Sequence, residues 1–172
     1  FAQKLISIAP GDLNRVLLAP GGSSAIGIAL KLARAATGRF KTISLWDSFH
    51  GASLDAISVG GESAFRKNAG PLLPGCEHAP PPDPSHCPFR CTTTCNLACA
   101  DYIEYMLDRE GDVAAVVAET VRNVPVIPPP DYWKRVRAAC DKHNALLILD
   151  EIPIGLGRTG RFFAFQHYDI IP

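Results

Sequence analysis

The stretch Leu146–Leu149, followed by Asp150 and Glu151, constrains the fold of this chain more than any other segment. Four large aliphatic residues in a row are typical of a strand buried on both faces, as in the centre of a parallel sheet. A carboxylate at the carboxyl end of such a strand lies where open α/β sheets bind their ligands. The alternative is that both acids only end the strand and meet solvent. We therefore predict a central strand with a candidate ligand group at its end.

Short apolar runs alternate with longer amphipathic segments along the rest of the chain. Strands are predicted at residues 15–19, 42–46, 112–118 and 146–149, and helices at 25–36, 96–109 and 132–143. Such alternation predicts an α/β fold with a parallel sheet and right-handed crossovers. Gly38 and Asp131 are predicted to cap helices. The predicted buried positions of the three helices are Ile28, Leu32 and Ala35, then Leu97, Ile103 and Leu107, then Trp133, Val136 and Ala139.

Prolines interrupt residues 60–90, where regular helix or central strand is not expected. A loop this long in a compact domain usually covers the mouth of a site or a subunit interface. We expect one of these roles, and residues 70–84 are the candidate for interface contact.

The charges of the chain balance, with 17 Lys plus Arg and 17 Asp plus Glu. A net charge of zero gives no reason to expect nucleic acid or a membrane surface as partner. No apolar run is long enough to span a bilayer, and the N-terminus does not resemble a signal peptide, so we expect a cytoplasmic protein. Because the chain starts on Phe1 rather than Met, and stops just after a helical-looking segment, we expect a fragment of a longer protein.

Four cysteines, Cys87, Cys91, Cys95 and Cys99, recur at a spacing of four residues. On a helix they would form one stripe and could bind a metal ion. Pro88 and the threonines that follow Cys91 argue against a helix before about residue 96, and the spacing differs from the C-x-x-C pairs of zinc sites. We therefore expect free thiols in a loop and no metal site.

Candidate ligand groups follow four of the predicted strands. After residues 15–19 come Gly21, Gly22 and Ser23, whose backbone N–H groups at a helix start suit a phosphate, although plain helix capping by serine is the alternative. After residues 42–46 come Phe49 and His50, which offer a flat ring and a polar group; alternatively, Phe49 belongs to the core and His50 to a solvated loop.

Glu119 and Asp150 follow the last two predicted strands. Because parallel strands bring their carboxyl ends to one edge of the sheet, the four sets of groups are expected to lie together. A phosphate cup, a stacking ring and a buried carboxylate are the parts needed to hold a phosphorylated aromatic base. A carboxylate beside a pyridine nitrogen keeps it protonated, so that the ring can accept electrons from a carbanion.

The order of these motifs resembles that of the class III, ornithine/omega-type, aminotransferases that use pyridoxal phosphate. The matching motifs are Gly22-Ser23-Ser24-Ala25 and its helix, Thr37-Gly38-Arg39, Phe49-His50-Gly51, and Asp150-Glu151 followed by Gly155-x-Gly157-Arg158-Thr159-Gly160. The resemblance covers essentially the whole chain. It implies fold type I, a three-layer α/β sandwich around a mostly parallel sheet, and a homodimer.

The resemblance also implies roles for individual residues. Gly21, Gly22 and Ser23 would bind the phosphate, Phe49 would stack on the pyridine ring with His50 beside it, Ile152 would pack on the opposite ring face, and Asp150 would pair with the ring nitrogen, supported by Glu119. In the family the Schiff-base lysine lies beyond the Arg-Thr-Gly turn. We therefore expect residues 1–172 to be part of the large cofactor-binding domain, without the catalytic-lysine segment or the small C-terminal domain, and inactive alone.

Three departures from the family pattern concern the reaction. Pro153 stands where a glutamine usually contacts the cofactor, Thr120-Val121-Arg122-Asn123 replaces Pro-x-Gln-Gly, and Val124 replaces a glutamate found in some members. Arg122 could hold an anionic group of the substrate, unless it lies at the surface or pairs with Glu119. Transamination is the expected activity. The alternatives are an ammonia-lyase acting on an amino acid or a hydroxylated aminophosphonate, and a non-catalytic binding remnant.

Overall fold

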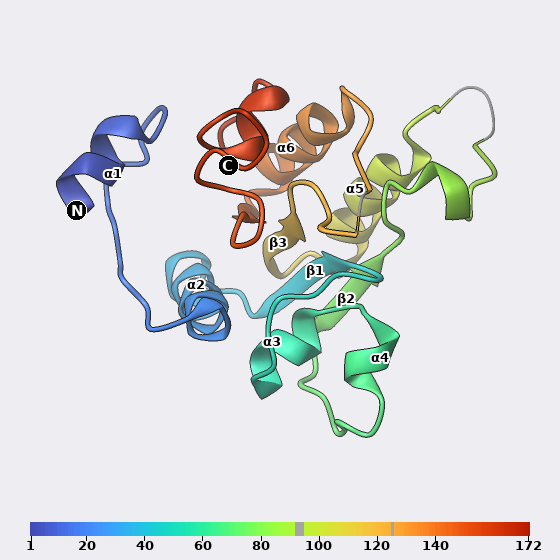
Figure 1. The fold of residues 1–172 in the computed structure, drawn as a ribbon. Helices are drawn as coiled ribbons and strands as arrows, with labels where there is room; N and C mark the ends of the chain where they lie inside the picture. Colours follow the sequence, from blue (N-terminus) through green and yellow to red (C-terminus); the bar gives the residue numbers. More distant parts are fainter. Residues whose placement is uncertain (92–94, 125) are drawn as a thin grey trace.

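The computed structural model describes residues 1–91, 95–124 and 126–172. Within these ranges four parallel strands form one sheet in the order β2-β1-β3-β4. The strands are β1 (Lys41–Leu45), β2 (Cys76–Ala79), β3 (Val113–Glu119) and β4 (Leu146–Asp150). Helices cover both faces of the sheet (Figure 1), which confirms the predicted three-layer α/β architecture.

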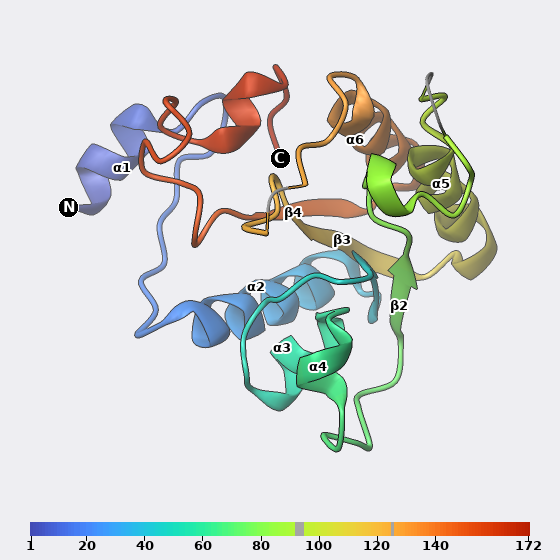
Figure 2. The same cartoon turned by 45° about the vertical axis from the view of Figure 1, so that its right-hand side comes forward.

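One face of the sheet is covered by α2 (Gly22–Thr37) and α3 (Leu54–Val59), and the other by α5 (Ala98–Glu110) and α6 (Tyr132–His143). Figure 2 shows the first pair, together with the short α4 (Ser63–Arg66), on one side and the second pair on the other. Every residue of β3 is buried, and from Ala115 to Ala118 its side chains alternate between the two apolar layers. The chain also contains α1 (Ala2–Ile8) and two 3₁₀ turns, η1 (Pro84–His86) and η2 (Ala164–His167).

Most predicted elements are confirmed within a few residues, and α6 spans the residues predicted for it. α2 ends at Gly38, whose φ of +68° is left-handed. Asp131 is the N-cap residue of α6, but its side chain makes no capping hydrogen bond. The predicted core positions of α5 and α6 are buried. No helix in the described ranges is long and apolar enough to cross a membrane.

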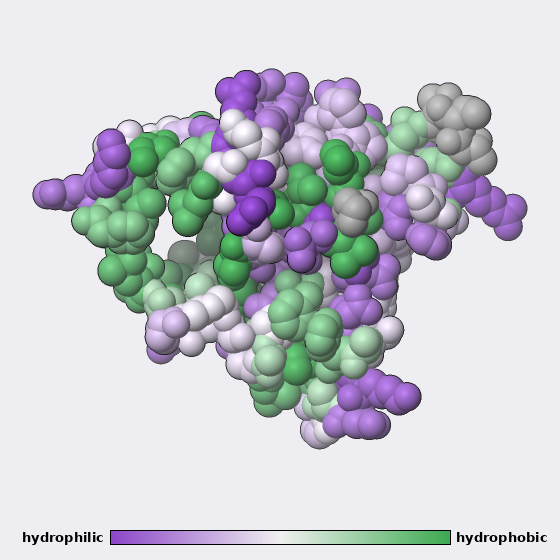
Figure 3. Space-filling view, in the orientation of Figure 1, coloured by the Kyte–Doolittle hydropathy of each residue, from purple (hydrophilic) through white to green (hydrophobic). Residues whose placement is uncertain are grey.

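The predicted strand at residues 15–19 is wrong. This segment is extended but pairs with no strand, and it runs outside the sheet from α1 to α2 (Figure 1). Leu17 and Leu18 are 65% and 66% exposed. Hydrophobic side chains therefore gather along this N-terminal segment on the face shown in Figure 3.

The predicted central position of residues 146–149 is wrong. The inner strands of the described sheet are β1 and β3, whereas β4 lies at the end of the strand order and its Leu146 is 42% exposed. The stripe predicted for α2 is also wrong, because Ile26, Leu30 and Ala33 are buried while Leu32 is 56% exposed. Apolar residues occur on more than one side of this helix, so periodicity alone does not select the buried side.

The proline-rich stretch contains more regular structure than predicted, namely α4 and the short strand β2. β2 has only four residues, of which Glu77 and His78 are polar, and it pairs with β1 alone. A strand this short at the end of a sheet carries little periodicity, which explains why the sequence did not indicate it.

Candidate active site

The carboxyl ends of β1, β3 and β4 and the start of α2 surround one open cavity of about 520 Å³. The cavity brings together nearly all of the residues that the sequence indicated as ligand groups. Those lining it are Gly22, Ser23, Phe49, His50, Glu119, Arg122, Asp150 and Ile152. Gly21 does not line it, but immediately precedes α2 as its N-cap residue. The grouping expected from parallel strands is thus present.

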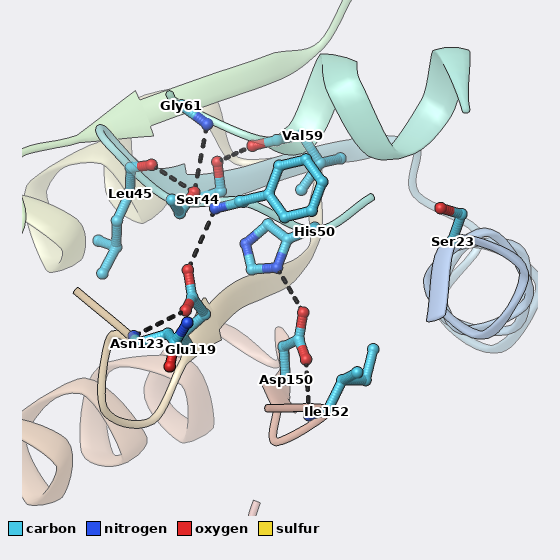
Figure 4. Close-up of polar contacts among 12 residues, drawn as sticks. Ser23, Ser44, Leu45, His50, Val59, Gly61, Glu119, Asn123, Asp150 and Ile152 are labelled. Carbon is cyan, nitrogen blue, oxygen red and sulfur yellow. Dashed lines mark hydrogen bonds and ion pairs between the residues drawn. The ribbon is translucent and has the colours of Figure 1, made fainter. Parts of the chain in front are cut away.

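Asp150 and His50 form a buried pair at this cavity, with exposed fractions of 5% and 2%. Asp150 Oδ2 lies 2.8 Å from His50 Nδ1, and the Ile152 N–H donates to Asp150 Oδ1 at 3.0 Å. Figure 4 shows the two side chains pointing toward each other, with Ser23 of α2 across an open space. His50 Nε2 is buried and has no hydrogen-bond partner among the described residues. The alternative of a solvated His50 is therefore wrong.

Glu119 ends β3 and is the register partner of Asp150 on β4. Its carboxylate accepts hydrogen bonds from the backbone N–H of Phe49 at 3.1 Å and of Asn123 at 3.4 Å. Glu119 therefore fixes the backbone that carries Phe49 and makes no hydrogen bond to Asp150. Phe49 is 43% exposed, so its alternative role as a core residue is wrong.

The start of α2 approaches the loop after β1 closely. The Ala52 N–H donates to Ser23 Oγ at 3.1 Å, and Gly51 has a φ of +130°. A Cβ atom on Gly51 would lie 2.9 Å from Ser23 Cα, so this contact requires glycine. No side chain in the described ranges caps α2. The serine-capping alternative is therefore not observed, and the first N–H groups of α2 are available to an anion.

Arg122 forms an ion pair with Glu62, whose Oε2 lies 2.9 Å from Arg122 Nη2. It is thus neither a free surface residue nor paired with Glu119. Glu62 and Phe65 line the cavity but were not indicated by the sequence. The ring of Phe65 lies 4.5 Å from that of Phe49, centroid to centroid. Both residues come from a segment without clear periodicity, so no sequence pattern could have found them.

The whole chain, residues 1–172, matches the sequence profile of the family Aminotransferase class-III. This chain belongs to that family. The (R)-1-hydroxy-2-aminoethylphosphonate ammonia-lyase of Vibrio splendidus (strain 12B01) is 52% identical over 187 aligned residues, which cover 99% of this chain and 39% of the relative. Family membership and the predicted similarity to ammonia-lyase-like members are therefore confirmed.

Two solved structures show the same fold. The (S)-enantioselective omega-transaminase from Thermomicrobium roseum superposes with a TM-score of 0.93 and 32% identity, over 99% of this chain and 41% of that one. The taurine:2-oxoglutarate aminotransferase from Bifidobacterium kashiwanohense, solved with PLP and glutamate, gives 0.88 and 33%, over 99% and 40%. The class III chain spans about two fifths of the length of these relatives.

Class III aminotransferases depend on pyridoxal phosphate (PLP). The cavity of this chain fits that cofactor on three observations. The first turn of α2 is uncapped, the side chains of Phe49 and Ile152 both line the space, and so does the buried carboxylate of Asp150. An anionic phosphate, a flat ring and a ring nitrogen are thus matched by groups of opposite or complementary character.

Proposed function

We propose that this chain forms the cofactor-binding part of a PLP-dependent aminotransferase, which moves an amino group between an amine or amino acid and a keto acid. One observation carries the proposal. Asp150 is a buried carboxylate, oriented by His50 and by the Ile152 N–H, in the same cavity as the uncapped start of α2. This arrangement offers a fixed negative group and an anion site to one small ligand.

The roles follow from these positions. Gly21, Gly22 and Ser23 would hold the phosphate through backbone N–H groups and the Ser23 hydroxyl. Phe49 and Ile152 would contact the two faces of the ring, with His50 beside it. Glu119 would position Phe49 through its backbone, a more indirect role than the sequence suggested.

Asp150 is the group that tunes the chemistry. When bound, PLP supplies an electron sink that stabilises a carbanion at the amino carbon of the substrate. The Asp150 carboxylate would hold a proton on the pyridine nitrogen, because a nearby negative charge favours the protonated form of that nitrogen. His50 would keep the carboxylate in place, since its Nδ1 already lies 2.8 Å from Asp150 Oδ2.

The test uses the full-length protein that contains this chain. Amine donors are supplied with pyruvate or 2-oxoglutarate, and keto acid product is measured together with PLP affinity. We expect Asp150→Asn to abolish most turnover, whereas Asp141→Asn, on the surface of α6, should match the wild type. A purified protein that binds PLP but transfers no amino group under any donor–acceptor pair would contradict the aminotransferase proposal; one that binds no PLP would support the non-catalytic alternative.

An ammonia-lyase is the second candidate, favoured by Arg122 and by the 52% identity to the V. splendidus relative. A guanidinium at the cavity can hold a phosphonate or carboxylate through two hydrogen bonds. Lyase activity would release ammonia without a keto acid acceptor. Arg122→Met should raise KM for an anionic substrate, while Arg109→Met, exposed on α5, serves as the control.

We also propose that residues 1–172 are part of a large cofactor-binding domain that works in a homodimer. The exposed Leu17 and Leu18 support an interface at the N-terminal segment, in addition to the predicted contact at residues 70–84. Light scattering of the full-length protein would test the dimer, and Leu17→Ser with Leu18→Ser should weaken it. The cytoplasmic location stays a prediction.

A further inference from the structure

Four cysteines that the proposed function does not use line one small hollow. Cys87, Cys91, Cys95 and Cys99 surround it together with prolines that include Pro81 and Pro82. None of these residues lines the cofactor cavity. All four thiols are free; Cys87 and Cys91 are half-buried, Cys95 is exposed and Cys99 is buried. The fold therefore gathers, beside a loop, thiols whose spacing alone predicted no common site.

Cys87 and Cys91 are joined by a tight turn. The Arg90 N–H donates to the Cys87 carbonyl at 3.0 Å, and Arg90 has a φ of +57°. Hydrogen bonding from the Cys91 backbone, the largest cause, lowers the pKa of the Cys87 thiol against an opposing effect of burial. Cys87 is thus more easily deprotonated than an ordinary cysteine, and the turn places it beside Cys91 on the rim of the same hollow.

The Cys91 thiol is placed to react with a modified Cys87. Its sulfur lies 3.4 Å from Asn96 Oδ1, and Cys91 lines the same hollow as Cys87. The Asn96 N–H lowers the pKa of Cys91, but the Cys87 sulfur, burial and Cys95 together raise it more, so the pKa of Cys91 is raised. Two neighbouring thiols, of which one has a lowered and the other a raised pKa, are the arrangement found in redox-sensitive cysteine pairs.

The arrangement favours oxidation over metal binding. In the described ranges, no three His, Cys, Asp or Glu side chains are grouped to hold a metal ion. The one carboxylate at the hollow, Asp83, already accepts the Ser85 N–H at 2.8 Å and contacts His86 Nδ1 at 2.9 Å. Oxidation of two neighbouring thiols to a disulfide is therefore the reaction that this group of cysteines favours.

We propose that Cys87 and Cys91 form a reversible disulfide site that reacts with low-molecular-weight disulfides such as oxidised glutathione. The Cys87 thiolate attacks one sulfur of the oxidant, whose S–S bond breaks and releases one thiolate. Cys91 then loses its proton to solvent and attacks the Cys87 sulfur of the mixed disulfide, which releases the second thiolate. Two protein thiols are oxidised and one oxidant disulfide is reduced to two thiols.

Peptide mapping tests this site directly, because trypsin cleaves after Arg90 and separates the two cysteines. Cys87 falls in peptide 68–90 and Cys91 in peptide 91–109. After equilibration in glutathione redox buffers and alkylation, we expect a disulfide-linked pair of these peptides that disappears on reduction with dithiothreitol. Cys87→Ser should abolish the link. Cys76→Ser, which removes the other cysteine of the same peptide, should leave it intact.

Two further measurements keep the test decisive. Cys91→Ser should trap Cys87 as a mixed disulfide with glutathione, and at pH 7 Cys87 should be alkylated about tenfold faster than Cys95. Circular dichroism of each variant confirms that it is folded. A peptide link that survives Cys87→Ser, absence of any link in oxidising buffer, or zinc that co-purifies in a one-to-one ratio and protects all four thiols would each overturn the proposal.

Discussion

Asp150 and Glu151 are neighbours in the sequence, but they serve opposite sides of the same strand end. Asp150 faces the cavity, where His50 and one backbone N–H hold it. Glu151 faces the other way and accepts hydrogen bonds from Thr120 Oγ1 at 3.0 Å, from the Ala164 N–H at 2.7 Å and from the Phe165 N–H at 2.8 Å. The difference arises because successive side chains of a strand point to opposite faces.

The comparison separates a carboxylate that we propose to bind a ligand from one whose hydrogen bonds stabilise the fold. All three donors to Glu151 are groups of the protein, and two belong to the buried start of η2. Asp150 instead contacts His50 Nδ1, and the second ring nitrogen of this histidine, Nε2, has no partner in the described ranges. Substitutions at these two adjacent positions should therefore affect different properties.

The largest effect is expected for Glu151→Ala. It leaves two buried backbone N–H groups and one hydroxyl without an acceptor, which should lower the free energy of unfolding by about 3 kcal/mol. Urea denaturation followed by circular dichroism measures the loss. Glu104→Ala, which removes only an exposed ion pair with Lys142, should cost less than about 1 kcal/mol. An equal loss of unfolding free energy in the two variants would contradict the structural role of Glu151.

Asp150→Asn should give the reverse pattern. The amide can still accept from the Ile152 N–H and contact His50, so stability should stay within about 1 kcal/mol of the wild type. Turnover of the full-length protein should fall about 100-fold, equivalent to about 2.7 kcal/mol, because the charge beside the ring nitrogen is lost. Loss of stability as large as that of Glu151→Ala would mean that Asp150 is mainly structural.

Thr120→Val isolates one hydrogen bond on the structural side. The Thr120 side chain is fully buried and donates to Glu151 Oε1, which also accepts from the Phe165 N–H. Loss of this donor should destabilise the fold by about 1 kcal/mol and leave PLP affinity unchanged within about twofold. A clear drop in PLP affinity would show that the two sides of the strand end are coupled.

The smallest effect is expected for Glu119→Gln. Glu119 both lines the cavity and accepts hydrogen bonds from the backbone, and glutamine keeps most of these contacts. The amide oxygen can still accept from the Phe49 N–H. The amide NH2 group cannot accept from the Asn123 N–H, so only this bond, already long at 3.4 Å, is lost. We expect a loss of about 0.5–1 kcal/mol in stability and a change in PLP affinity much smaller than for Asp150→Asn. Titration with PLP beside urea denaturation checks both values.

Much of this fold was accessible from sequence because β3, β4 and the amphipathic helices carry strong periodic signals. Residues 15–19 were wrongly predicted as a strand because a short apolar run indicates burial. In the described part of the chain no strand lies beside this segment to accept its hydrogen bonds. The stripe of α2 was misassigned because Leu32 and Leu30 are equally apolar, and only the position of the sheet decides which is buried.

The candidate site was predicted at its strand ends and missed at its rim. Asp150, Glu119 and Phe49-His50 follow strands, so topology alone gathers them at one edge. Glu62 and Phe65 reach the cavity from a segment whose path depends on tertiary contacts, and the partner of Arg122 could not be known without that path. The different hydrogen-bond partners of Asp150 and Glu151 likewise could not be predicted without knowing the path of the backbone.

The bonds made by Glu119 have a consequence for how new reactions can evolve on this scaffold. One carboxylate anchors both the loop that carries Phe49 and the turn at Asn123, while Val121, Arg122 and Val124 make no hydrogen bond to Asp150 or His50 among the described residues. Substitution of these turn residues should therefore leave the geometry of the proposed cofactor groups unchanged. The side chains of the turn can then vary independently of the Asp150–His50 pair.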